Sequence, residues 1–439
     1  MKQFSFIKFI NFRRENNSTL IVDKRNYSYI IVYRTLLLYY ILKEMQKDRS
    51  YDRIPMVLAN RYNVPVGIME KKINELLHVV QKHWLSYNNK PDKSSCNYFE
   101  RSLSLRVPIS LEILLTYKCN LKCNHCLYGT IPGEGNEMLT EEILNIAAQM
   151  EKEKIFFVAF SGGEPTLHKD FFVLLEEFSR RKIEIGLSTN GILLNQIKFI
   201  KRLERFNIKS FNISIEGSNA SMNDDLRGYG TFFKITKALR MLVNSGRADQ
   251  IVVKITYGKQ NYLYIENIVN LLRKIGIKKI AFHRLKKWGR AKKLKEYIPT
   301  YREIEYVNKK ILELRTKYPD VIIEGDSAYT QSKVNSCAVS LSLTILPSGD
   351  VVPCNIFGVN TTREIILGNV KEQPIKKIWN NTKSKTIRSY VQYLFKSNNY
   401  ICSKCADFLY CPSPRCIAYN YLSHKKFLSN PYKCFHLNT

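Results

Sequence analysis

Short β-prone runs alternate with helical patterns through the middle of this 439-residue chain. The expected strands cover residues 109–116, 155–160, 183–188, 209–215, 251–257 and 278–284. Helical patterns cover residues 170–181, 193–206, 231–244 and 261–275. Because each helix carries the chain back to the end of the sheet where the previous strand began, this order predicts an α/β fold with a parallel sheet. The carboxyl ends of six parallel strands then share one edge, which is where such folds place their sites.

Three cysteines follow the first expected strand. Cys119, Cys123 and Cys126 lie in the run Tyr-Lys-Cys-Asn-Leu-Lys-Cys-Asn-His-Cys. A 4Fe-4S cluster has four irons, so three thiolates leave one iron open for a small molecule. A partial zinc site and unrelated buried thiols are the alternatives, although zinc prefers four closed ligands. The triad therefore predicts a reactive iron–sulfur centre.

A glycine pair follows the second expected strand, in the run Ser161-Gly162-Gly163-Glu164-Pro165. Two glycines allow the backbone to approach a ligand closely, and a carboxylate can accept hydrogen bonds from an ammonium group. A plain strand-to-helix turn is the alternative. The glycine pair and the cysteine triad together are far more specific than either one alone.

The two motifs together resemble the radical SAM superfamily. This resemblance implies a partial (β/α)6 barrel whose open iron binds the amino and carboxylate groups of S-adenosylmethionine. It also implies the following cofactor contacts: Gly162, Gly163 and Glu164 at the methionine end, Ser188 and Asn190 at the ribose, Arg227 at the carboxylate, and His125 beside the adenine.

Alternatives stay open for the weaker assignments. Residues 188–190 also fit a capping turn. Arg227 also fits an arginine on the surface, and His125 also fits a solvated side chain. Glu216 follows the fourth expected strand and is predicted to position the substrate or move a proton. A surface carboxylate is equally consistent with its place in the sequence.

Seven of the eleven cysteines lie between Cys337 and Cys434. Their pattern resembles the SPASM extension of peptide-modifying radical SAM enzymes, which holds two auxiliary 4Fe-4S clusters, for three clusters in all. The resemblance assigns Cys402, Cys405, Cys411 and Cys434 to one cluster, and Cys337, Cys354 and Cys416 to another with an open iron. The chain departs from the family pattern by one extra residue before Cys416. A zinc knuckle built from the C-terminal four cysteines is the alternative, because C-x2-C pairs also bind zinc.

The N-terminal 95 residues have neither cysteine nor the strand–helix alternation. β-prone segments at 5–10, 18–22 and 27–32 precede helical patterns at 35–46, 54–62 and 65–83, as in a winged-helix module. On a SPASM enzyme this order resembles the PqqD-like RiPP recognition element, which pairs the leader of a precursor peptide with a sheet edge beside a helix. Contacts are then expected from residues 18–32 and 70–81. A DNA-binding winged helix is the alternative.

Three domains follow: a leader-recognition domain at 1–95, the radical SAM barrel at 105–320 and the SPASM domain at 330–439. A polar linker is expected at 88–97, with Cys96 in it as a plain thiol.

The formal net charge is +31, which steers acidic partners such as an acidic leader peptide or nucleic acid. Residues 271–295 contain eleven Lys or Arg and no Asp or Glu. This stretch fits either a surface for an acidic peptide or a solvated helix face.

Because no targeting or membrane-spanning segment is apparent and the cysteines suit a reducing compartment, a cytoplasmic location is expected.

These features predict a peptide maturase. The resemblance implies that a 5'-deoxyadenosyl radical takes hydrogen from a carbon of a ribosomally made precursor peptide. A cysteine sulfur then bonds to that carbon, giving a thioether of the sactipeptide or ranthipeptide type. A low-potential donor of the flavodoxin or ferredoxin type supplies electrons. The alternatives are carbon–carbon crosslinking, oxidation, decarboxylation, sulfatase maturation and, outside enzymes, a zinc-binding winged-helix nucleic-acid regulator; nucleic-acid binding is not the expectation.

Overall fold

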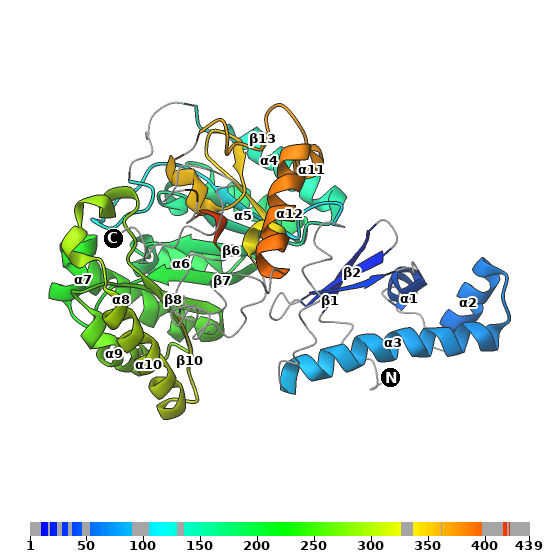
Figure 1. The fold of residues 1–439 in the computed structure, drawn as a ribbon, viewed down its shortest axis with the longest axis horizontal. Helices are drawn as coiled ribbons and strands as arrows, with labels where there is room; N and C mark the ends of the chain where they lie inside the picture. Colours follow the sequence, from blue (N-terminus) through cyan, green and yellow to red (C-terminus); the bar gives the residue numbers. More distant parts are fainter. Residues whose placement is uncertain are drawn as a thin grey trace. The chain divides into compact units, whose positions relative to one another are not determined.

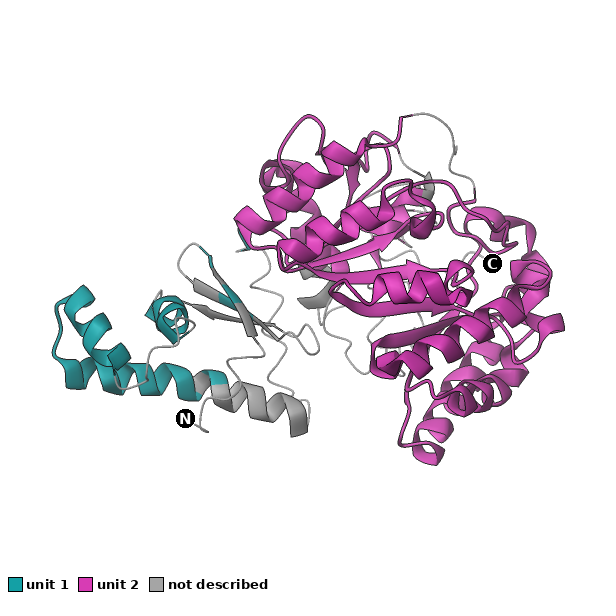
Figure 2. Ribbon diagram, turned by 180° about the vertical axis from the view of Figure 1, so that it is seen from behind, with its two compact units in different colours: residues 1–106 teal, residues 107–439 magenta. Residues whose placement is uncertain are grey.

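The computed structural model describes residues 10–15, 18–23, 29–33, 37–45, 53–89, 105–129, 136–325, 337–360, 362–396, 416–418 and 421. The chain divides into two compact units, residues 1–106 and 107–439 (Figure 2). Several predictions lie outside the described residues: most of the strand at 5–10, the linker beyond residue 89, Cys96, Cys402, Cys405, Cys411 and Cys434.

The first unit consists of an antiparallel sheet followed by three helices, as the sequence predicts. The strands are β1 (Ile10–Arg14), β2 (Ser18–Asp23) and β3 (Tyr29–Tyr33), in that order, and the helices are α1 (Leu37–Met45), α2 (Arg53–Tyr62) and α3 (Val66–Asn89). Phe12 and Ile21 from the sheet share one buried core with apolar residues from all three helices. The helix α3 extends into the start of the expected linker, since it ends at Asn89.

The second unit is built on one long sheet. The six expected strands are all present, as β4 (Ser110–Leu114), β5 (Phe157–Ser161), β6 (Glu184–Thr189), β7 (Ile208–Ser214), β8 (Ile251–Tyr257) and β9 (Lys279–Arg284). They lie side by side in sequence order, and each neighbouring pair is parallel. The predicted α/β class and parallel sheet are therefore confirmed.

Helices connect these strands as expected, at α5 (Phe171–Arg180), α6 (Ile197–Leu203), α8 (Thr231–Leu242) and α9 (Ile265–Ile275). Several further helices were not predicted, among them α4 (Thr140–Glu153), α7 (Ala220–Arg227) and α10 (Tyr301–Lys317). The sequence carried a signal for α4, because Ile143, Ile146, Ala147 and Met150 are buried at helical spacing and two glutamates occupy its first turn.

Four additional strands extend the sheet beyond the predicted six. The strand β10 (Ile322–Glu324) pairs with β9 at one end, and β11 (Ser342–Ile345) pairs in parallel with β4 at the other. β12 (Asp350–Val352) and β13 (Gly368–Asn369) continue from β11 in antiparallel order. The cysteine-rich C-terminal region is thus joined to the barrel sheet by backbone hydrogen bonds.

Two helices close this region, α11 (Ile375–Asn380) and α12 (Thr382–Lys396) (Figure 1). Trp379 of α11 is fully buried, and the guanidinium of Arg388 from α12 lies 3.8 Å from the centre of the Trp379 ring.

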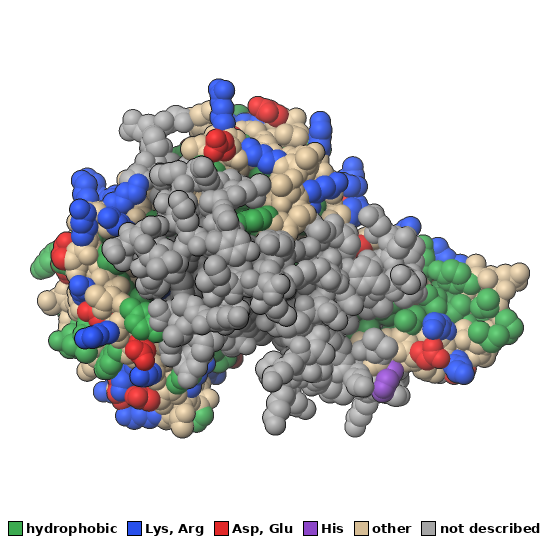
Figure 3. Space-filling view, viewed as in Figure 1, with side chains coloured by type: hydrophobic (Ala, Val, Ile, Leu, Met, Phe, Trp, Pro, Cys, Tyr) green, Lys and Arg blue, Asp and Glu red, His purple; other side chains and the backbone are tan. Residues whose placement is uncertain are grey.

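No helix within the described ranges is both long and apolar enough to cross a membrane. On the face shown in Figure 3, the described Lys and Arg side chains are dispersed rather than gathered in one patch.

Candidate active site

The loop after β4 carries Cys119, Cys123 and Cys126, and backbone contacts hold it in place. The amide of Asn124 donates to the carbonyl of Leu226 at the end of α7, over 2.8 Å. Arg290, in the turn after β9, donates from its backbone N–H to the Cys126 carbonyl (3.0 Å) and from Nε to the Cys123 carbonyl (2.8 Å). The predicted cluster loop is therefore fastened by two segments far away in the sequence.

Two thiols of the triad, Cys119 and Cys123, have a raised pKa. Burial, followed by the charge of neighbouring groups that include Cys126, raises the pKa of Cys119 and of Cys123. Because metal ligands must be thiolates, a bound cation would reverse this penalty. Within the described ranges no three His, Cys, Asp or Glu side chains are grouped as ligands of one metal ion. Thiolates of a four-iron cluster bind separate irons, so the cluster prediction does not require such a group.

Gly162 and Gly163 lie against the backbone that leads into the triad. A Cβ on Gly163 would stand 2.4 Å from the carbonyl oxygen of Lys118 and 2.5 Å from that of Tyr117. Gly162 has a φ of +133° and would meet the carbonyl oxygen of Thr116 at 2.5 Å. In the structure these two glycines allow close contact with the backbone that leads into the triad. Contact with the methionine end of the cofactor stays a prediction. The glycine pair thus shapes the approach to the triad.

Glu164 is buried and holds two strand ends together. Its carboxylate accepts hydrogen bonds from the amide and hydroxyl of Thr166, from the hydroxyl of Thr189 (2.7 Å) and from the amide of Asn190 (2.7 Å). Burial raises the pKa of this carboxyl, and these hydrogen bonds oppose the increase. Thr189 was missed by sequence reasoning, although it directly precedes Asn190 in the motif-like run at the end of β6.

Asn190 reaches the cluster loop, as expected for a residue at this edge. Its side-chain amide donates to Asn120 Oδ1 (2.8 Å) and lies 3.8 Å from the sulfur of Cys119. Its Oδ1 also accepts a hydrogen bond from the amide of Ile192. This contact forms the capping turn that the sequence allows as an alternative for residues 188–190. Ser188 lies within β6, paired with Asn212 of β7, two residues before Asn190. The structure therefore places Asn190 beside the triad, while the contact of Ser188 with the ribose stays a prediction.

Glu216, His125 and Arg227 form a buried charged cluster. Glu216 is 1% exposed, so the alternative of a surface carboxylate is wrong. Its Oε1 lies 2.9 Å from Arg227 Nη1 and 3.1 Å from His125 Nε2, and its Oε2 accepts from the amide of Thr256. Arg227 is 5% exposed, which excludes the surface arginine as well. Burial opposes the charge of Glu216, but His125 and Arg227 outweigh it and lower the pKa of this carboxyl.

Two polar atoms of this cluster are buried without a hydrogen-bond partner among the described residues, His125 Nδ1 and Arg227 Nε. Buried polar atoms are normally paired, so these two are suited to a bound group. The main chain of Arg227 also faces the triad, since its carbonyl lies 3.9 Å from the sulfur of Cys123. A solvated His125 is therefore excluded, and the cluster adjoins the predicted iron–sulfur centre.

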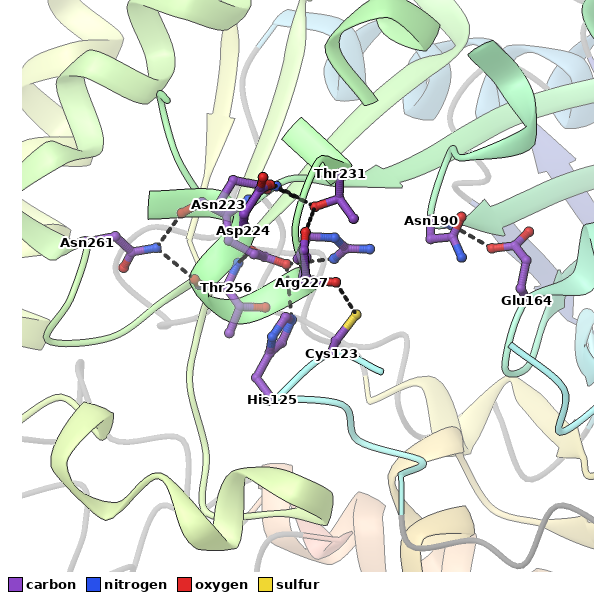
Figure 4. A network of polar contacts seen from close by, with 12 residues as sticks. Cys123, His125, Glu164, Asn190, Asn223, Asp224, Arg227, Thr231, Thr256 and Asn261 are labelled. Carbon is purple, nitrogen blue, oxygen red and sulfur yellow. Dashed lines mark hydrogen bonds and ion pairs between the residues drawn. The ribbon is translucent and has the colours of Figure 1, made fainter. Parts of the chain in front are cut away.

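A ring of amides and hydroxyls holds the charged cluster in position (Figure 4). Asn223 accepts from the amide of Glu216 (3.0 Å) and donates to Thr231 (2.9 Å). Asn261 donates to the carbonyls of Glu216 (2.8 Å) and Thr256 (3.0 Å). None of these supporting residues was predicted. The nearest sequence signal was the polar run around Arg227, since Asp224 accepts from the amides of Gly230 and Phe232.

A second set of thiols gathers in the C-terminal region. Burial, followed by the charge of Cys416, raises the pKa of Cys337 to about 12. Burial and then Cys416 and Cys337 raise the pKa of Cys354 well above its usual range. The three cysteines assigned to one auxiliary cluster are therefore close enough for their charges to interact, although they come from positions 337, 354 and 416 of the chain.

The fold and site define a class of enzyme in which a parallel α/β sheet carries a three-thiolate loop and a glycine-rich loop at its carboxyl edge. Residues 113–272 match the Radical SAM superfamily, and residues 337–406 match SPASM, an iron–sulfur cluster-binding domain. The chain therefore carries a radical SAM domain and, C-terminal to it, a SPASM domain.

Characterised relatives share most of this chain's length. The mycofactocin maturase MftC of Mycolicibacterium smegmatis is 28% identical over 298 residues, 65% of this chain and 73% of the relative. The antilisterial bacteriocin subtilosin biosynthesis protein AlbA of Bacillus subtilis is 23% identical over 345 residues, 77% of this chain and 69% of the relative. The crystal structure of Streptococcus suis SuiB bound to its precursor peptide SuiA has a TM-score of 0.67 at 18% identity, covering 96% of this chain and 97% of SuiB. The likeness to SuiB shows a shared fold.

The donor set of this site fits the cofactors of the superfamily, S-adenosylmethionine and iron–sulfur clusters. Three free thiols are available as cluster ligands, and the free Nε of Arg227 is a donor suited to a carboxylate. Asn190 and His125 Nδ1 are further polar groups beside the triad.

Proposed function

We propose that this enzyme matures a ribosomally made peptide by forming a thioether between a cysteine sulfur and a peptide carbon. The observation that supports a peptide substrate is the fold shared with SuiB, which was crystallised with a precursor peptide. In this fold the region with the second set of thiols joins the barrel sheet, because β11 pairs with β4. The names of MftC and AlbA also describe peptide maturation and bacteriocin biosynthesis.

The thioether proposal rests on the number of cysteines. Seven cysteines between Cys337 and Cys434 are one short of the eight that two fully ligated four-iron clusters need. An iron without a protein thiolate favours a substrate thiolate as its ligand, because soft iron–sulfur centres prefer sulfur. When bound, the reduced cluster and S-adenosylmethionine supply a 5'-deoxyadenosyl radical, which can take a hydrogen atom from carbon.

The residues of this chain have separate roles in this proposal. Cys119, Cys123 and Cys126 hold the cluster that binds S-adenosylmethionine, and Arg227 binds its carboxylate. Glu216 keeps Arg227 ionised and oriented, because their 2.9 Å contact is buried and raises the pKa of the guanidinium against the effect of burial. This is a positioning role, and it differs from the proton transfer suggested by the sequence. The N-terminal sheet and helices bind the leader of the precursor.

The first test measures iron and labile sulfide per chain after anaerobic reconstitution. About twelve irons in the native protein and about eight in a variant with alanine at all three triad positions are expected. Zinc with little iron, together with a shift of duplex DNA in a binding assay, would instead support the zinc-binding regulator.

The second test uses the short cysteine-containing peptide encoded nearest the gene. Incubation with enzyme, S-adenosylmethionine and a reductant is expected to give 5'-deoxyadenosine and a peptide about 2 Da lighter, since one C–H and one S–H hydrogen are lost. The product should also have lost one thiol that iodoacetamide can alkylate. A lighter product with every thiol still alkylated would replace the thioether with a carbon–carbon crosslink or an oxidation.

A further inference from the structure

Lys254 points away from the helices that cover the barrel sheet. It lies in β8 between Val253 and Ile255, which are both fully buried. Side chains alternate along a strand, so Lys254 faces the opposite side, while its strand neighbours are Ser214 and Ala281. Lys254 retains partial exposure on that inner face.

Glu112 of β4 faces the same interior. Its carboxylate accepts hydrogen bonds from Ser161 Oγ (2.8 Å) and Thr344 Oγ1 (3.3 Å), and Asn355 Nδ2 lies 3.5 Å away. The strands β5, β6 and β7 separate β4 from β8, so a flat sheet would place Glu112 about 19 Å from Lys254, at about 4.8 Å per strand. The charge of Glu112 nevertheless acts on Lys254. Both side chains therefore face the same concave interior, from opposite sides of the curved sheet.

This interior adjoins both sets of thiols. Tyr128, two residues after Cys126 of the triad, lies against Gly358, four residues after Cys354 of the C-terminal set, since a Cβ on Gly358 would stand 3.6 Å from its ring. Asn355, beside Glu112, directly follows Cys354 in the sequence. A molecule held between Glu112 and Lys254 is thus close to the space between the two predicted clusters.

Lys254 has no hydrogen-bond or ion-pair partner within 4.0 Å among the described residues, and burial lowers the pKa of its ammonium group, with Glu112 opposing that effect. A cation in such a place gains strongly from an anionic ligand, because the ligand restores the interactions lost with water. Thr256, whose amide contacts Glu216, lies two residues nearer the carboxyl edge, about 6.6 Å along the strand. Lys254 therefore lies deeper in the barrel than the cluster of Glu216 and Arg227.

We propose that Lys254 binds a carboxylate of the peptide substrate inside the barrel, while Glu112 opposite it excludes a second acidic group, so that the enzyme selects peptides with one acidic group near the modified residue. This inference rests on the proposed peptide substrate. The carboxylate belongs to an acidic side chain or to a chain terminus; the carboxylate of S-adenosylmethionine is assigned to Arg227 instead.

The test uses N-acetylated pentapeptides with cysteine at the second position, and reconstituted full-length enzyme with S-adenosylmethionine. One peptide has central Glu and an amidated end, the second has Gln and an amidated end, and the third has Gln and a free carboxylate. Binding is measured by saturation-transfer NMR for the native enzyme and for Lys254→Met, Lys254→Arg and Lys254→Glu. The native enzyme is expected to bind one of the two acidic peptides about tenfold more tightly than the neutral one, as one charge-assisted contact allows.

Each variant gives a distinct expected result. Lys254→Met should abolish the preference, Lys254→Arg should keep part of it, and Lys254→Glu should favour a matched peptide with central Lys. Iron content and peptide-independent release of 5'-deoxyadenosine should stay within about twofold of native, which shows that the variants fold. Equal binding of acidic and neutral peptides by the native enzyme would overturn the proposal. A loss of affinity for S-adenosylmethionine without any change in peptide preference would also overturn it, and would assign Lys254 to that carboxylate.

A separate result would show that the proposed function is wrong while the carboxylate site is right. In that result no peptide binds, but N-acetylglutamate binds to the native enzyme and not to Lys254→Met.

Discussion

The Nε of Arg290 donates a 2.8 Å hydrogen bond to the carbonyl oxygen of Cys123, across 167 positions of the sequence. The backbone N–H of the same arginine donates to the carbonyl of Cys126. The basic stretch at 271–295 is therefore not a solvated helix face throughout, because this arginine fastens the cluster loop. The basic stretch covers the end of α9, all of β9 and the turn that follows β9.

Replacing Arg290 with alanine should loosen the cluster that the triad holds. The backbone contact to Cys126 remains, so the loss is one hydrogen bond of about 1 kcal/mol, and an iron chelator should remove the cluster about fivefold faster. The loss is followed anaerobically by absorbance of the iron–sulfur chromophore. Lys292→Ala, which removes an exposed charge from the same turn, is the control and should match the native rate. Equal rates for both variants would show that the side chain of Arg290 does not support the loop.

Replacing Gly163 with alanine should disrupt the triad without unfolding the rest of the chain. The added methyl would meet two backbone oxygens at 2.4 and 2.5 Å, and neither can rotate away. We expect about four fewer irons per chain and little peptide-independent 5'-deoxyadenosine. Gly67→Ala in α3 has open space around its Cβ and should be neutral or slightly stabilising, by up to about 1 kcal/mol. Native iron content in Gly163→Ala would contradict the close contact.

Glu216 should make the stability of the metal-free protein depend on pH. Its pKa is lower in the folded chain than in the unfolded chain, where a glutamate titrates near about 4.3. The ionised carboxylate therefore stabilises the fold above that pH, and this contribution is lost as the pH falls through the lower folded value.

The variant Glu216→Gln should lose about 3 kcal/mol of unfolding free energy at pH 7, because Arg227 is left buried beside a neutral amide. The difference between native and variant should shrink below about pH 4. Urea unfolding at several pH values measures both. A difference that is constant with pH would mean that the carboxylate is not ionised in the folded chain.

Arg388 should be dispensable for stability despite its burial. Its Nη1 donates to the carbonyl of Trp379 (2.7 Å), but its Nε and Nη2 have no partner among the described residues, and burial lowers its pKa to about 10. Because an incompletely paired buried cation costs desolvation energy, Arg388→Met should unfold in urea at the native midpoint or higher. Arg388→Lys, which keeps the charge and loses the contact with the ring, should unfold at a lower concentration. A large loss of stability in Arg388→Met would reveal a partner for the guanidinium elsewhere in the chain.

Local sequence patterns predicted the strands of the barrel well. The six runs were found within a few residues because β-prone apolar residues and the helical spacing between strands depend only on neighbours in the chain. The same reasoning placed Cys119, Gly162, Asn190 and Glu216 together, since parallel strands bring their carboxyl ends to one edge. It missed β11, whose pairing with β4 joins positions 342 and 110 and carries no local signal.

The sequence by itself thus determined the fold class, the family and the residue types at the site. The tertiary structure decided which of those side chains meet. Glu216 contacts His125 and Arg227, Arg290 holds the cluster loop, and Glu112 and Lys254 line the same barrel interior. The physical reason is that periodicity assigns each residue to a face of its strand or helix, whereas contacts across the interior depend on the order and curvature of the whole sheet.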